Sequence, residues 1–152
     1  MATHKSDIIT AKDSASLADK AFASAPKVGG LVLFTQAVYV LKGTEAANDI
    51  IHLCDLPRDV IPEPDKSNVV CQDPGTTLTL DIGYTANPDG LADGIVLSNG
   101  GKVEFTSATL PADAVTPFTT TDQLRISATV ASAATLTAGA RLVFNIAYRI
   151  AG

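Results

Sequence analysis

The sequence predicts an all-β fold, an antiparallel β-sandwich or jelly roll with an extended N-terminal arm. Short alternating or β-branched runs recur between residues 30 and 150, turn residues separate them, and no long helical pattern lies between them. Short strands without crossover helices are typical of stacked antiparallel sheets. We therefore divide the 152 residues into an arm, 1–27, and a β-sandwich (jelly-roll-like) domain, 28–152.

The first 27 residues differ from the remainder in composition. They are rich in Ala, Ser, Lys and Asp, and they end shortly before the pair Gly29-Gly30. The run from Ser14 to Ala23 fits a short helix capped by Ser14, which would be marginal on its own. We expect the arm either to be a disordered terminus or to become ordered against a neighbouring molecule. Its candidate partner-binding anchors are Ile8, Ile9, Leu17 and Phe22.

Seven or eight strands are expected in the domain. The seven assigned runs are residues 31–41, 49–56, 67–72, 76–82, 102–106, 123–131 and 141–150. In the last three of these and in 76–82, aliphatic or aromatic residues alternate with polar ones, which indicates one buried and one wet face. We expect residues 84–91 to be a turn-rich excursion with one helical turn after Asn87-Pro88, and 111–121 to be a loop. Ser132–Gly139 is expected to be a hairpin loop between the last two strands.

Charge and hydropathy exclude two classes of partner. The formal net charge is −5 and the pI is near 4.8, with the 11 Lys and Arg residues scattered singly. Nucleic-acid binding uses clustered basic residues, so no direct nucleic-acid partner is expected. No run approaches the roughly 18–20 apolar residues of a membrane span, and residues 1–14 lack the apolar region of a secretory signal. We expect synthesis in the cytoplasm and no membrane partner.

The two cysteines have two interpretations. Cys54 and Cys71 both lie in expected strands beside apolar residues, where buried free thiols are common. A disulfide between them is the alternative if those two strands pair. Their spacing is not that of a zinc site.

No catalytic or cofactor site emerges from the motifs. The histidines are His4, in the arm, and His52, in an expected strand, and no GxSxG elbow accompanies them. We interpret His52 as a structural or surface residue. The glycine pairs lie outside any strand–GxGxxG–helix or P-loop context, so no nucleotide cofactor is expected. The sequence therefore predicts a binding protein and no enzyme.

A cluster of acidic residues is a weak metal candidate. Asp81, Asp89 and Asp93, with Asn87, crowd a short region (DIGYTANPDGLADG). Oxygen ligands on a loop suit Ca²⁺, but the order is not that of an EF-hand. Asp and Asn also form turns for local reasons, which is the alternative explanation.

The order of features between Asp49 and Gly101 resembles a known family. A strand ends in Leu-Pro (DIIHLCDLPRDVIP), a Thr/Leu alternation enters Asp-Ile-Gly (TLTLDIG), and Asn-Pro-Asp-Gly-Leu-Ala-Asp-Gly leads to a Gly-Gly turn. The chain closes with NIAYRI. This order resembles small structural proteins of tailed bacteriophages, the head decoration or capsid cement proteins, over roughly residues 30–150.

The resemblance implies a function and a set of partners. It implies a jelly-roll body on the outer surface of the phage head that binds the major capsid protein and stabilises contacts between its copies. It also implies a virion location and a homo-oligomer, as trimer or dimer, or contacts with neighbouring copies on the shell. Because jelly rolls host many functions, a receptor- or carbohydrate-binding module of a phage fibre or tail is the alternative. A small hydrolase is a third and weaker functional alternative.

Overall fold

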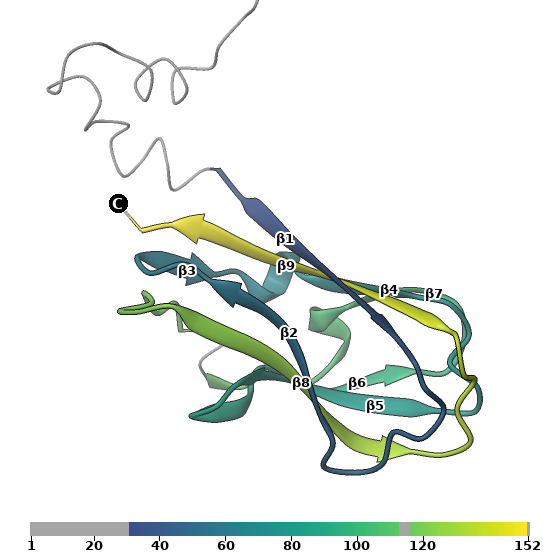
Figure 1. The fold of residues 1–152 in the computed structure, drawn as a ribbon. Helices are drawn as coiled ribbons and strands as arrows, with labels where there is room; N and C mark the ends of the chain where they lie inside the picture. The colour runs from purple at the N-terminus through teal and green to yellow at the C-terminus, as the bar shows by residue number, and fades with distance from the viewer. Residues whose placement is uncertain (1–30, 113–115, 152) are drawn as a thin grey trace, which may run out of the picture.

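The computed structural model describes residues 31–112 and 116–151 as two stacked antiparallel sheets (Figure 1). One sheet has the order β1-β9-β4-β7, with β3 also pairing with β9, and the other has the order β2-β8-β5-β6. The strands are β1 (Leu33–Val40), β2 (Ile50–Leu56), β3 (Val60–Pro62), β4 (Asn68–Cys71), β5 (Leu78–Tyr84), β6 (Asn87–Leu97), β7 (Gly101–Glu104), β8 (Leu124–Ala133) and β9 (Arg141–Ile150). Two 3₁₀ turns, η1 (Pro64–Lys66) and η2 (Phe105–Ser107), follow β3 and β7.

The connectivity is that of a jelly roll. The chain crosses from one sheet to the other after nearly every strand, and only the β3–β4 and β5–β6 connections stay within a sheet. With β3 and β4 taken as one interrupted strand, each sheet has four strands, as in a double Greek key. The predicted all-β class and antiparallel sandwich are confirmed.

The core lies between the two sheets and is built from the alternation expected from the sequence. On β9, Leu142, Phe144 and Ile146 point inward and are fully buried. The facing sheet contributes further fully buried side chains, Leu78, Leu80 and Ile82 from β5 and Ile126, Ala128 and Val130 from β8. Interdigitation of two apolar inner faces is what holds such a sandwich together.

The expectation of a turn-rich excursion with a helical turn over residues 84–91 was wrong. The turn is limited to Thr85 and Ala86, and β6 begins at Asn87. Proline and glycine are tolerated in this strand because β6 forms the edge of its sheet. β5 is its strand partner there, and on its other side Asp93 forms an isolated bridge with Thr109. Register shifts on both sides of Ile82 absorb the extra residues as bulges. The short β3 was also missed.

The expected hairpin at Ser132–Gly139 was wrong as well. β8 extends to Ala133 and belongs to one sheet, whereas β9 belongs to the other. The segment between them therefore crosses the end of the sandwich, where Leu136 forms an isolated bridge with Gly75. The small residues of this segment correctly predicted that the chain turns between β8 and β9. They do not determine whether the two strands that they connect pair with each other.

Thr120 anchors the loop before β8 to β3. Its side chain is 4% exposed, and its hydroxyl accepts a hydrogen bond from the Val60 N–H (3.0 Å) and donates one to the Pro57 carbonyl (2.9 Å). Two backbone bonds reinforce the contact, Asp59 N–H to Thr120 O and Thr120 N–H to Val60 O, both 2.8 Å. The hydroxyl thus provides a partner for the N–H of the buried Val60 and ties it to the Pro57 carbonyl.

We expect Thr120→Val to destabilise the protein by about 1–3 kcal/mol, because valine keeps the shape but leaves the Val60 N–H and Pro57 carbonyl without this partner. Urea denaturation measures the change. The control is Thr119→Val, whose side chain is exposed and whose loss should cost less than about 0.5 kcal/mol. Equal unfolding midpoints for the two variants would contradict the assignment.

No helix in the described ranges is long and apolar enough to cross a bilayer.

Candidate binding surfaces

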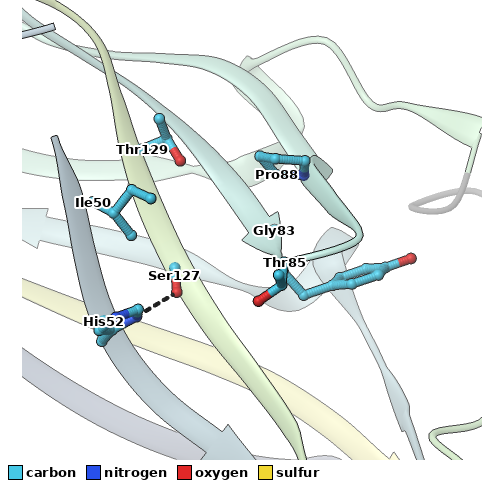
Figure 2. Close-up of a pocket in the computed structure, with 8 residues that line it drawn as sticks. Ile50, His52, Gly83, Thr85, Pro88, Ser127 and Thr129 are labelled. Carbon is cyan, nitrogen blue, oxygen red and sulfur yellow. Dashed lines mark hydrogen bonds between the residues drawn. The ribbon is translucent and has the colours of Figure 1, made fainter. Parts of the chain in front are cut away.

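His52 lies in a shallow pocket on the solvent side of the β2-β8-β5-β6 sheet (Figure 2). Its Nδ1 is 3.0 Å from the Ser127 hydroxyl on β8, and Ile50, Thr85, Pro88 and Thr129 are among the other residues lining the pocket. A Ser-His pair is the start of a nucleophilic site, which also needs a carboxylate to orient the imidazole. Asp55 on the same strand is instead held by both Arg125 Nε (2.7 Å) and Arg125 Nη2 (2.9 Å).

The size of this pocket also argues against a substrate site. Its volume is about 120 Å³, whereas pockets that enclose drug-sized ligands have roughly 300–1,000 Å³. The geometry therefore agrees with the interpretation of His52 as a surface residue whose ring is held by Ser127.

The two cysteines are free, lie in different sheets and have thiols whose pKa values are raised. Cys54, on β2, and Cys71, on β4, lie in different sheets and are both free. Burial, and to a lesser extent the charge of Asp55, raises the pKa of Cys54 to about 11, so its reactive thiolate form is disfavoured. Burial also raises the pKa of Cys71, whose Sγ lies 3.3 Å from the Asn99 carbonyl.

The three aspartates proposed as a weak metal candidate lie on two paired strands, Asp81 on β5 and Asp89 and Asp93 on β6. Burial raises the pKa of Asp81, and the charges of Asp93 and Asp89 raise it further. Asp81 Oδ1 accepts a hydrogen bond from the Gly94 N–H (2.9 Å), which bridges β5 to the irregular part of β6. In the described segments no three His, Cys, Asp or Glu side chains are grouped to hold a metal ion.

Glu45 closes the loop between β1 and β2. Its carboxylate accepts hydrogen bonds from the Tyr39 hydroxyl (2.8 Å), the Lys42 N–H (2.7 Å) and the Gly43 N–H (3.0 Å). Burial alone would raise the pKa of Glu45, but these bonds outweigh it and lower the pKa below the ordinary value of 4.5. Burial and then Glu45 raise the pKa of Tyr39 to about 12. Both carboxylate oxygens of Glu45 therefore accept hydrogen bonds that hold this loop in place.

The carboxylate of Glu45 binds a proton less well in the folded state than in the unfolded state, because its pKa is lowered by folding. We therefore expect its contribution to stability to be full above pH 4.5 and to be lost as the pH falls through the lower folded-state pKa. Urea denaturation of Glu45→Gln should show a loss of about 1 kcal/mol at pH 7 that is smaller at pH 3. Tyr39→Phe, which leaves the carboxylate in place, should retain most of the pH dependence. A Glu45→Gln deficit that is equal at both pH values would refute this.

The outer face of the β1-β9-β4-β7 sheet carries an apolar stripe. Val38 on β1 lies opposite Val143 on β9, and Val143 lies opposite Val70 on β4, so three valines form a row across three strands. Directly opposed side chains of this kind are in contact. Val40 continues the stripe along β1. Val38 and Val40 are each 48% exposed and Val70 is 40% exposed.

A ladder of amides lies beside the stripe. Gln36 Nε2 donates to Asn145 Oδ1 (3.0 Å), and Asn145 Nδ2 donates to Asn68 Oδ1 (2.9 Å). On the far side of this ladder Phe34 is 55% exposed. We call these residues the outer face: Phe34, Gln36, Val38, Val40, Asn68, Val70, Val143 and Asn145.

The opposite outer surface has a different character. On the β2-β8-β5-β6 sheet the outward positions are mostly polar, namely His52, Thr79, Asp81, Arg125, Ser127 and Thr129. Its exposed apolar side chains, Ile50 and Val96, lie on opposite edge strands, β2 and β6. An exposed apolar surface is confined to few sites on soluble proteins and usually marks a contact. The outer face is therefore the candidate binding surface of the described residues.

The sequence contained a signal for this surface that the strand assignment did not use. In residues 31–41 both alternating sets are apolar, with Val38 and Val40 on one side and Leu33 and Tyr39 on the other. A strand that is apolar on both faces is typical of burial on both sides. The expected anchors Ile8, Ile9, Leu17 and Phe22 lie outside the described residues.

Comparison with solved structures finds this fold in phage capsids. A chain from the capsid of Ralstonia phage GP4 matches with a TM-score of 0.59 and 23% identity, over 81% of this chain and 86% of that one. A chain from the cyanophage Pam1 capsid asymmetric unit matches with a TM-score of 0.50 and 15% identity, over 78% and 84%. This protein shares its fold with components of phage capsids.

A third such chain comes from the acidic stable capsid structure of Helicobacter pylori bacteriophage KHP30. It matches with a TM-score of 0.50 and 14% identity, over 81% of this chain and 90% of that one. No family model and no curated protein matches the sequence.

Proposed function

We propose that this protein is a virion structural protein, a decoration or cement protein that binds the outer surface of a tailed-phage head. The observation that carries the proposal is the jelly roll matched in three phage capsids over most of both chains. Because 84–90% of each matched chain is covered, those chains, like this one, consist mainly of a single jelly roll. A single jelly roll suits an added component that reinforces a shell.

The described surface supports adhesion as the mechanism. The sandwich presents the outer face, whose valine stripe provides apolar contact area. The partner in this proposal is the major capsid protein, with further copies of this chain as neighbours, as trimers or dimers. The arm, residues 1–27, ties the body to the shell or to a sister copy, and its ordering there exchanges chain entropy for contact area.

The test is co-sedimentation of the purified full chain with shells assembled from the major capsid protein of its phage. We expect saturable binding and an increase in the melting temperature of the shells, because a ligand that binds the assembled state stabilises it. Deletion of residues 1–24 should leave the β spectrum unchanged and reduce occupancy. Full occupancy by the truncated protein would remove the arm from the mechanism. Absence of binding by the full chain, together with hits on a glycan array, would favour a receptor- or carbohydrate-binding role instead.

A further inference from the structure

The four edge strands of the two sheets differ in how they resist pairing with another strand. β7 has only four residues and carries Lys102 and Glu104. β2 has a register shift after His52 and the charged Asp55, and β6 contains Pro88 among its bulges. Short length, charges, bulges and proline are the features by which proteins protect sheet edges.

β1 has none of these features. It is eight residues long, its sequence LFTQAVYV contains no charge or proline, and its register with β9 is unbroken over eight pairs. In the described part of the chain no strand pairs with its other side. A long and unbroken edge of this kind, without charges, is a template for an additional strand.

The hydrogen bonds to neighbouring residues determine which positions of β1 face that open side. The Leu41 N–H donates to the Ala140 carbonyl (2.9 Å), so Leu41 is a hydrogen-bonded position of the β1–β9 pair. The backbone groups of an antiparallel strand alternate in direction from residue to residue. The even-numbered residues Phe34, Gln36, Val38 and Val40 therefore direct their N–H and C=O groups away from β9.

β9 gives an independent check on this alternation. The carbonyls of Arg141 and Ala147 accept hydrogen bonds from the N–H groups of Gln72 and Glu63, on the side away from β1. Odd-numbered residues of β9 thus bond toward β4 and β3, and even-numbered ones toward β1. The even-numbered residues of β9 lie opposite the odd-numbered residues of β1. This agrees with the Leu41 hydrogen bond, which also directs the odd-numbered residues of β1 toward β9.

The chain itself supplies a segment of suitable chemistry. Thirty residues precede Leu31, the first described residue, which leads directly into β1. They contain one β-branched run, Ile8-Ile9-Thr10, between Lys5 and Lys12. The 20 residues between Thr10 and Leu31 span up to about 65 Å when extended, well beyond the roughly 27 Å length of an eight-residue strand. The run can therefore reach this edge.

Charge favours this segment over the body of another copy. Residues 1–27 hold four Lys and three Asp, a net charge of +1, whereas residues 28–152 hold seven basic and thirteen acidic residues, a net charge of −6. Two bodies that pair edge to edge repel each other, but the arm does not repel the body. We propose that residues 6–12 of this protein add as a strand to the open edge of β1. The proposal holds whether or not the protein decorates a capsid.

Hydrogen exchange of the full chain, measured by NMR, tests this directly. We expect the amides of Phe34, Gln36, Val38 and Val40 to be protected, although β9 does not bond to them. Ile9→Pro removes a ladder donor and should lower their protection by about tenfold or more. The odd-numbered amides of β1 should be unchanged and show that the body is folded. Ala15→Pro, a matched change outside the run, should have no effect.

Three results would overturn the proposal. The first is fast exchange at the even-numbered β1 amides in the wild-type chain. The second is protection that survives Ile9→Pro and falls on dilution, which would identify the β1 edge of a second copy as the occupant. The third is protection that arises only after shells are added, which would identify a strand of the shell protein.

Discussion

Gly83→Ala is expected to prevent stable folding. A Cβ atom at this position would lie 2.2 Å from the Asn87 carbonyl oxygen and 2.5 Å from the Pro88 carbonyl carbon. Both obstacles are backbone atoms of the paired strand β6, so no side-chain rotation relieves the clash. Relief requires separation of β5 from β6, whose inner faces carry the fully buried Leu80 and Ile95. We expect a loss above about 4 kcal/mol, most of the stability of a small domain.

The matched control is Gly94→Ala in the same hairpin. Gly94 has a φ of +81°, but nothing lies within 4 Å of the position that an added methyl group would take there. Alanine at this residue meets only backbone strain, which costs about 1–2 kcal/mol. Circular dichroism and urea denaturation of the soluble fractions compare the two variants. Similar unfolding midpoints for both would show that the close approach at Gly83 is not required for the fold.

The same hairpin shows where sequence reasoning stops. Asn87, Pro88 and Gly90 have strong local preferences for turns, and those preferences predicted an excursion over residues 84–91. Pairing with β5 overrides them, because the bulges beside Ile82 bring Leu91, Ile95 and Leu97 into the core, where they are at most 1% exposed. Bulges shift the alternation of side chains, so a period of two cannot be followed through them.

Elsewhere the local pattern was sufficient. β9 alternates between core and surface from residue 141 to 146 and β8 from 125 to 131, and their inward residues, such as Phe144 and Ile126, were identified from the sequence alone. The candidate surface was not predicted from the sequence. Val38 and Val40 fell in an expected strand, but their exposure follows from the orientation of β1, which points them away from the core, and the Val38–Val143–Val70 row joins strands that are far apart in the sequence. Such placement is a property of the topology, which local periodicity does not encode.

Phe144→Ala is the second change with a large expected effect, a destabilisation of about 3–5 kcal/mol. Phe144 is fully buried on the inner face of β9, between Ala37 on β1 and Val69 on β4. Truncation leaves a cavity between the sheets that the surrounding strands cannot fill. Thermal or urea denaturation measures the loss, and an unchanged denaturant slope would show that the unfolded state is not altered.

Phe34→Ala provides the matched comparison, because it removes the same atoms from the other side of the same sheet. Phe34 is 55% exposed, so its truncation should change stability by less than about 1 kcal/mol. If both variants were equally destabilised, the outer face would be part of the folded body's own packing. If only Phe144→Ala is destabilised, folding does not account for an exposed phenylalanine beside the valine stripe. Under the proposed function, contact with another chain accounts for this exposed phenylalanine, and Phe34→Ala should weaken that contact while it leaves the sandwich intact.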